Sequence, residues 1–175
     1  MKWPRSSRVL GSLVVLLAGL SCTTGEGAPT EPPLPVSETA GRIGISPVVS
    51  VLLLCEPQQY VSATKTIGRQ GGSLRFGRHR LEIPSGALTS GVTITAEQVS
   101  GDVNSVRLSP EGLRFARPAR LTLEYKNCAD TRLAKRVAYT DELLRILEMP
   151  SSKDYPKYDY VTGEIDHFSR YAVAY

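Results

Sequence analysis

The chain has 175 residues and a mass of 19.0 kDa, which is enough for one domain with an additional tail. Its 41% hydrophobic and 22% charged residues are near the average of soluble globular proteins, and they exclude a fully disordered chain and a multi-span membrane protein. The formal charge of +4 comes largely from the first 21 residues, which hold three of the 21 basic residues and no acidic residue. The remainder is nearly neutral, so the global charge gives no support for nucleic-acid binding.

The N-terminus has the pattern of a secretory signal peptide. Lys2, Arg5 and Arg8 precede an uncharged run from Val9 to Leu20. As a helix this run would be about 18 Å long, too short to span a bilayer. A positive start, a short apolar run and small residues after it are typical of a signal for export.

The residues Ala18-Gly19-Leu20-Ser21-Cys22 resemble the end of a bacterial lipoprotein signal, in which a cysteine receives lipid after cleavage. The resemblance implies that residues 1–21 are removed, that Cys22 carries lipid, and that the chain is anchored to a membrane of the cell envelope. The protein domain would then lie outside the cytoplasm. An ordinary signal peptide, cleaved nearby and leaving Cys22 as a free thiol, is the alternative.

The chain has three cysteines, Cys22, Cys55 and Cys128. If Cys22 is acylated, two remain, and an even number suits an oxidising compartment. We therefore expect a disulfide between Cys55 and Cys128, closing a long loop and stabilising the fold by roughly 4 kcal/mol. The alternative is that both are small buried hydrophobic residues.

Residues 22–42 are rich in Pro, Gly, Ser, Thr and Glu and read as a semi-extended tether. The composition changes at residue 43, and we expect a single β-domain over 43–175. Val48–Leu54 is β-branched and apolar and predicts a buried strand. The segment 141–147 is compatible with a helical turn or with a strand.

Short alternating apolar runs follow, separated by turn residues such as Pro84-Ser85-Gly86. This period of two predicts strands that bury one face each, and many such strands indicate an all-β antiparallel sandwich. The runs contain Leu74 and Phe76, Leu81 and Ile83, Val92 to Ala96, Val106 and Leu108, Leu113 and Phe115, Leu121 to Tyr125, and Tyr171 to Tyr175.

Several motifs over about residues 66–125 resemble a ZU5 domain, and the segment 166–173 resembles its last strand. The residues that carry the resemblance are Gly71-Gly72-Ser73-Leu74, Leu81-Glu82-Ile83-Pro84-Ser85-Gly86-Ala87-Leu88, and Ser109-Pro110-Glu111-Gly112-Leu113-Arg114-Phe115-Ala116-Arg117-Pro118. The resemblance implies a sandwich-like β-module that binds partners or packs on a neighbouring domain. It carries no spectrin site to this chain, because no binding residue matches position by position.

The triplet His167-Phe168-Ser169 is the sharpest chemical motif. Some ZU5 relatives cleave themselves between the Phe and Ser of such a triplet, and the resemblance implies a Ser169 hydroxyl nucleophile with His167 as general base. The alternative is an intact chain in which His167 and Phe168 pack and Ser169 bonds to the backbone. We find no other catalytic motif and expect neither an enzyme of many turnovers nor a cofactor or metal.

Two further groups are interpreted as structural. The sequence Arg78-His79-Arg80 predicts a solvated positive patch. Four acids and three tyrosines gather near the end of the chain. We interpret the segment Ser151–Gly163 as a polar loop whose tyrosines cap the core edge. The alternatives are a calcium site or a surface that binds sugars or partner side chains. The group consists of Asp154, Tyr155, Tyr158, Asp159, Tyr160, Glu164 and Asp166.

Taken together, the sequence predicts a non-enzymatic lipoprotein of the cell envelope whose ZU5-like sandwich binds an unidentified protein or polymer through a sheet face or a loop. Nucleic acid is not an expected partner. A purely structural surface lipoprotein and a module that cleaves itself at Phe168–Ser169 are the alternatives.

Overall fold

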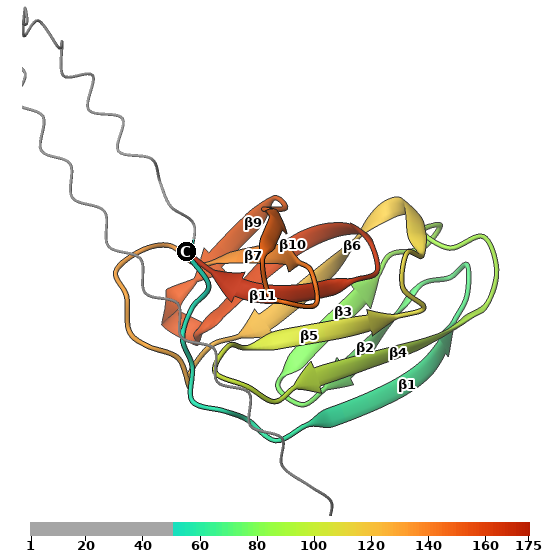
Figure 1. Ribbon diagram of the computed structural model, residues 1–175. Coiled ribbons are helices and arrows are strands. Elements are labelled where there is room, and N and C mark those ends of the chain that lie inside the picture. Colours follow the sequence, from blue (N-terminus) through green and yellow to red (C-terminus); the bar gives the residue numbers. More distant parts are fainter. Residues whose placement is uncertain (1–50) are drawn as a thin grey trace, which may run out of the picture. The chain divides into compact units, whose positions relative to one another are not determined.

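A computed structural model describes residues 51–175 of the chain. These residues form eleven β-strands and one short 3-10 helix. The strands build two antiparallel sheets that stack face to face (Figure 1), which confirms the predicted all-β antiparallel sandwich. The predicted signal peptide (1–21), the tether (22–42), Cys22 and residues 43–50 of the predicted domain lie outside the described residues.

One sheet has six strands and the other has five. The six-stranded sheet has the spatial order β1 (Val61–Ile67), β4 (Val92–Val99), β5 (Ser105–Ser109), β11 (Arg170–Ala174), β7 (Arg136–Thr140) and β8 (Ile146–Glu148). The five-stranded sheet has the order β2 (Gly72–Phe76), β3 (His79–Ile83), β6 (Arg114–Glu124), β10 (Tyr160–His167) and β9 (Ser152–Tyr155). The 3-10 helix η1 (Pro156–Tyr158) connects β9 to β10.

The hydrophobic core lies between the two sheets and follows the alternation of side chains along each strand. In β3 the side chains of Leu81 and Ile83 are buried, and in β6 those of Leu121 and Leu123 are buried. The residues between them face solvent on the outer side of the five-stranded sheet. Each fully buried leucine stabilises the fold by about 2 kcal/mol, so the alternation predicted from sequence decides which face packs inward.

The chain crosses from one sheet to the other between β10 and β11. Phe168 occupies this crossing and is completely buried. Its ring meets the ring of Phe115 edge to face, with 5.0 Å between the centroids. The crossing therefore places an aromatic pair at the edge of the core, where it fills the space between the two layers.

The predicted strand over 48–54 is not a regular strand in the part of the chain that the structure describes. Val51 exchanges backbone hydrogen bonds with Tyr175, but the backbone N–H of Cys55 donates instead to the carbonyl of Asp102. The segment contributes only isolated β-bridges. The prediction was wrong because this stretch changes its backbone partner from the end of β11 to a loop before a ladder can form.

The predicted polar loop over 151–163 is also wrong. The segment forms β9, η1 and the start of β10, and Tyr155 of β9 pairs directly with Tyr160 of β10. Asp159 takes a left-handed backbone conformation with φ of 54° at the end of η1, which turns the chain into β10. The outward polar residues here line the solvent face of the five-stranded sheet, because only the inner face of that sheet packs on the core.

Pro118 lies inside β6 rather than before a new strand, so the two predicted runs on either side of it form one strand of 11 residues. β6 pairs with β3 only over Arg120 to Thr122, which follow Pro118 in the chain. Its pairing with β10 has an irregularity opposite Pro118, between Ile165 and His167. The missing N–H of proline therefore falls where neither neighbour requires a regular ladder.

The segment 141–147, for which the sequence left helix and strand open, is a turn that leads into β8. The Asp141 carboxylate accepts hydrogen bonds from the backbone N–H groups of Leu143, at 3.0 Å, and Arg145, at 2.9 Å. The hydrogen bond from the backbone of Arg145 is the main reason that the pKa of Asp141 lies below its usual value. An acidic side chain that organises the backbone in this way favours a turn over a helix.

The predicted solvated patch at 78–80 is only partly correct. Arg78 and Arg80 face outward, but His79 is 1% exposed and its ring lies 5.7 Å from that of Phe76. Its Nδ1 accepts a hydrogen bond of 3.2 Å from the backbone N–H of Glu124. The alternation along β3 places every second residue in the core, so His79 is buried although its side chain is polar.

The predicted disulfide between Cys55 and Cys128 is confirmed. The two residues lie opposite one another in an isolated antiparallel bridge, and their sequence separation is 73. The bond joins the segment before β1 to the segment after β6. Around it, the backbone N–H of Glu56 donates to the carbonyl of Asn127, and that of Ala129 donates to the carbonyl of Leu54, each at 2.8 Å.

Candidate functional site

The triplet His167-Phe168-Ser169 lies at the crossing between β10 and β11. The His167 ring packs edge to face against Tyr139 at 4.8 Å between centroids, and Ser169 is buried. The carbonyl oxygen of Phe168 accepts a hydrogen bond of 2.9 Å from the backbone N–H of Gly112. Within residues 51–175 no hydrogen bond joins the His167 side chain to Ser169. Cleavage of the Phe168–Ser169 peptide bond stays an alternative to the intact chain.

The acids near the end of the chain are not gathered into one place. The Asp154 carboxylate accepts hydrogen bonds from the Tyr125 hydroxyl, at 2.7 Å, and from the backbone N–H of Lys135, at 2.8 Å. Burial and this hydrogen bond raise the pKa of Tyr125 well above its usual value. Among the described residues, no three His, Cys, Asp or Glu side chains are placed to hold a metal ion. Over the same residues, no helix is long and apolar enough to cross a membrane.

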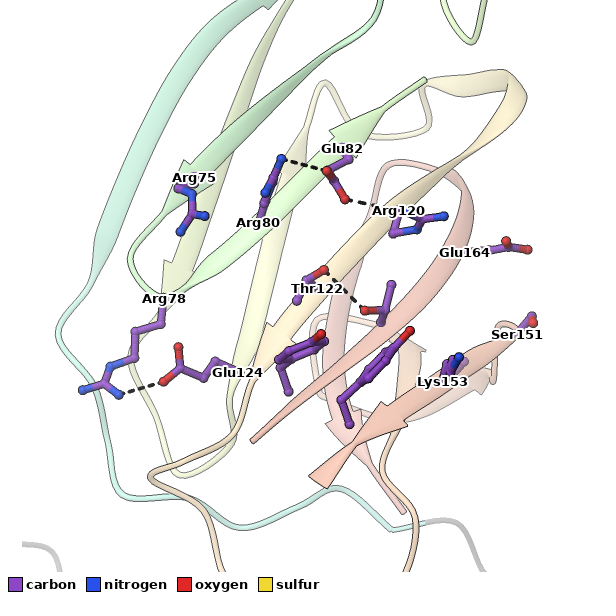
Figure 2. A pocket seen from close by; sticks show the side chains of 14 residues that line it. Arg75, Arg78, Arg80, Glu82, Arg120, Thr122, Glu124, Ser151, Lys153 and Glu164 are labelled. Carbon is purple, nitrogen blue, oxygen red and sulfur yellow. Dashed lines mark hydrogen bonds and ion pairs between the residues drawn. The ribbon is translucent and has the colours of Figure 1, made fainter. Parts of the chain in front are cut away.

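The structure instead brings polar residues together on the outer face of the five-stranded sheet (Figure 2). They line a groove of about 610 Å³, which we call the sheet groove. Five cations and three carboxylates line it, with hydroxyls of serine, threonine and tyrosine between them. The lining residues are Arg75, Arg78, Arg80, Glu82, Arg120, Thr122, Glu124, Ser151, Ser152, Lys153, Tyr155, Tyr160, Thr162 and Glu164.

The register of the strands arranges these side chains in rows across the sheet. The central row crosses all five strands and contains Arg75, Arg80, Thr122, Thr162 and Lys153. On one side of it lies a row of alternating charge that contains Glu82, Arg120 and Glu164. On the other side Glu124 is opposite Tyr160, which is opposite Tyr155. The groove therefore presents an ordered grid of charges and hydroxyls.

Ion pairs connect part of this grid. Arg80 pairs with Glu82 at 2.8 Å, and Arg120 lies 4.0 Å from the same carboxylate. Arg78 pairs with Glu124 at 2.9 Å (Figure 2). All of these side chains are substantially exposed, so each pair adds at most about 1 kcal/mol to stability. These ion pairs also hold the charged groups in place along the groove.

Other charged groups of the sheet groove have no ion pair among the described residues. These are the cations Arg75 and Lys153 and the carboxylate of Glu164. The ammonium of Lys153 lies over the ring of Tyr155, 5.1 Å from its centroid. Charges without partners remain available to a ligand, and the aromatic ring orients the lysine.

Tyrosines form the aromatic end of the groove. The rings of Tyr155 and Tyr160 are 4.7 Å apart between centroids, and Tyr158 of η1 stacks on Tyr160 at 6.1 Å. Tyr155 and Tyr160 are half-buried, which keeps their rings in fixed positions while part of each stays in contact with solvent. Such amphipathic rings offer both an apolar surface and a hydroxyl to a bound molecule.

A second hollow of about 430 Å³ continues the sheet groove beyond Arg120, toward Pro84 and Pro118. It shares Arg80, Glu82, Arg120 and Glu164 with the first. Within the described residues, neither hollow is lined by histidine or cysteine. The arrangement is suited to binding an extended polar molecule by charge and hydrogen bonds.

Sequence reasoning placed some of these residues on the solvent side of strands but did not identify the groove. The direct signals were the positive residues Arg78 and Arg80 and the group of tyrosines and acids near the end of the chain. The sequences that contain Arg75, Thr122 and Lys153 are far apart along the chain, and only the pairing of strands places them in one row. Comparison with protein-family models and with curated proteins finds no match to this chain.

Proposed function

We propose that this protein is an exported lipoprotein of the cell envelope whose ZU5-like sandwich binds a polymer or protein ligand in the sheet groove, without catalytic turnover. The observation that carries the proposal is the grid of cations, carboxylates and hydroxyls in a groove that crosses all five strands, in which Arg75, Lys153 and Glu164 have no ion pair among the described residues. Folding alone does not require so many charged residues on one face, since exposed ion pairs add little stability. A ligand would satisfy them.

The ZU5-like character is supported by the backbone at the motif glycines. Gly71, Gly86 and Gly112 all have positive φ angles, between 75° and 78°. At Gly71 a Cβ atom would lie 2.3 Å from the carbonyl oxygen of Ile83, so no other residue fits there without a shift of the backbone. The motifs thus occupy turns that need these residues, which is what a shared fold would demand.

The lipid anchor is supported by cysteine pairing. Because Cys55 and Cys128 are bonded to each other, Cys22 is the one remaining cysteine of the chain. A disulfide is also typical of a protein that folds outside the cytoplasm. Both observations agree with export and with a thiol at position 22 reserved for lipid.

We expect Cys22→Ala to abolish labelling by a fatty-acid probe, since the thiol is the acceptor of the lipid. The measurement is metabolic labelling with an alkyne fatty acid, followed by detection on the immunoprecipitated protein. Ser37→Ala, in the same proline-rich segment, serves as the control and should label like the parent. Equal labelling of the Cys22→Ala protein would contradict a lipid anchor at this position.

We expect Thr162→Trp to weaken binding of envelope material by at least about tenfold, equal to about 1.4 kcal/mol. Thr162 lies in the middle of the central row, and an indole there would fill the sheet groove. The measurement is saturable binding of the purified full-length protein to fractionated envelope material from the cells that make it. A thermal melt of each variant confirms that the fold is intact.

Thr95→Trp is the matched control for this experiment. Thr95 lies in β4, where it faces outward from the other sheet opposite Thr64. The same indole on that face should leave binding unchanged. If both variants bind like the parent, or if no saturable binding exists, the protein has a structural role and the groove is not a binding site.

A further inference from the structure

The central row of the sheet groove begins with two like charges in direct opposition. Arg75 of β2 is paired in register with Arg80 of β3, and both guanidinium groups are on the outer face (Figure 2). Like charges directly opposite one another destabilise a sheet. Glu82 forms an ion pair with Arg80, but within residues 51–175 no carboxylate pairs with Arg75. An anion bound between the two arginines would remove this repulsion.

A third cation ends the same row on the opposite edge of the sheet. Lys153 of β9 is separated from Arg75 by four strand spacings, which amount to about 19 Å. Between the cations lie Thr122 and Thr162, whose hydroxyl oxygens are 3.5 Å apart. The row therefore offers positive charge at both ends and neutral hydrogen-bonding groups in the middle, which matches an extended molecule with anionic groups at intervals.

The carboxylates of the groove restrict the kind of polyanion that fits. Glu82, Glu124 and Glu164 lie among the cations. They would repel a ligand of dense, uniform negative charge such as a nucleic acid, which carries one charge for each phosphate. They would accept hydrogen bonds from the hydroxyl groups of a ligand in which charge is interrupted by neutral polar segments.

An acidic peptide fits this surface less well than an acidic sugar chain. Peptide recognition on a sheet relies on pockets for alternate side chains. The lining residues of the sheet groove include no Ala, Val, Leu, Ile, Met or Pro, and Tyr155 and Tyr160 are its only aromatic residues. Sugar rings, in contrast, offer many hydroxyls to a surface rich in Ser, Thr, Tyr and Glu.

We propose that the sheet groove binds a polysaccharide whose negative charges are carboxylates, as in a polymer whose uronic acids are separated by neutral sugars. The inference rests on the proposed function and specifies its ligand. The guanidinium group of an arginine matches a planar carboxylate, to which it can donate two parallel hydrogen bonds. The central row spans about 19 Å across the strands, so it can contact several sugars of a polymer rather than a single sugar.

The test measures binding of oligosaccharides to the purified full-length protein by titration calorimetry. The probes are hyaluronan oligosaccharides, in which every second sugar carries a carboxylate, their methyl ester with the same backbone and no charge, the uniformly charged oligogalacturonate, dextran sulfate and poly-glutamate. We expect a carboxylated oligosaccharide to bind, its methyl ester to bind at least about tenfold more weakly, and affinity to fall as salt is raised. Tightest binding of dextran sulfate or of poly-glutamate would overturn the inference in favour of a sulfated polymer or an acidic protein.

Variants assign the binding to the central row. Arg75→Gln and Lys153→Gln should each weaken binding of the carboxylated oligosaccharide about tenfold. Arg75→Gln removes a like-charge repulsion, so a loss of affinity in this variant does not arise from unfolding. The matched controls are Arg132→Gln and Lys126→Gln, which remove exposed cations outside the groove and should bind like the parent. Equal loss in the controls would overturn the assignment to this row.

The outcomes separate this inference from the proposed function. If neither carboxylated probe binds, while the Thr162→Trp protein still loses its binding of envelope material, the groove is a binding site but the ligand is not a carboxylated sugar chain. If the Thr162→Trp protein binds envelope material like the parent, the proposed function itself is wrong. Carboxylate-dependent binding that is lost in Arg75→Gln supports both.

Discussion

Replacing Cys55 and Cys128 together by alanine should lower the free energy of unfolding by about 4 kcal/mol. The bond closes a loop with a sequence separation of 73, and without it the unfolded chain gains the conformational entropy that the loop removed. We expect the fold itself to persist, because backbone hydrogen bonds still join Glu56 to Asn127 and Ala129 to Leu54. Urea unfolding of the two proteins measures the difference.

The control for this experiment is Cys22→Ala, which leaves the disulfide in place and should unfold like the parent. A thiol reductant should lower the stability of the parent to that of the double variant and have no effect on the double variant. A difference below about 1 kcal/mol would show that the unfolded chain is already compact in this region, contrary to the entropic argument.

A second large effect is expected when the protein is acidified. Burial, with a smaller contribution from the nearby charge of Arg78, lowers the pKa of His79 from 6.5 to about 4. Above pH 6.5 the side chain is neutral in both states. Between pH 6.5 and 4 the unfolded chain binds a proton that the folded chain excludes, so the contribution of neutral His79 to stability is lost as the pH falls through this range. At 1.36 kcal/mol for each pKa unit, the loss amounts to about 3 kcal/mol.

His79→Gln tests this prediction, since its side-chain oxygen can still accept the hydrogen bond from the backbone N–H of Glu124. The free energy of unfolding is measured by urea at several pH values between 7 and 4. The variant should lose about 3 kcal/mol less than the parent over that range. His167→Gln, which changes the only other histidine of the chain, retains His79 and should keep the loss shown by the parent. Parallel curves for the parent and His79→Gln would contradict the assignment.

The two histidines of the chain show how one residue type changes its role with position. His79 and His167 each lie at the end of a strand of the same sheet. His79 points into the core, whereas His167 packs against Tyr139 at the margin of the sheets and stays partly exposed. The polarity of histidine predicted exposure for the first, and the alternation of β3 overruled it, because a strand places successive side chains on opposite faces.

Local sequence was sufficient where period and turn residues agreed. Runs such as Leu74 with Phe76 and Leu81 with Ile83 became β2 and β3, which pair across a hairpin. It was insufficient for β1, where Thr64, Lys65 and Thr66 are exposed at the sheet edge. It was also insufficient for β7, whose adjacent residues 137 and 138 are both buried, so that no alternation can be read.

By itself, the sequence determined the all-β class and the inward face of most strands, because these depend on local alternation. It favoured the Cys55–Cys128 disulfide only on the expectation that Cys22 carries lipid, and the structure decided that pairing. Only the tertiary structure decided which strands are neighbours, and therefore that Arg75, Thr162 and Lys153 share one row. The physical reason is that register between strands is set by long-range packing of their buried faces. The outward residues that form the sheet groove take their positions from that packing and leave no local pattern of their own.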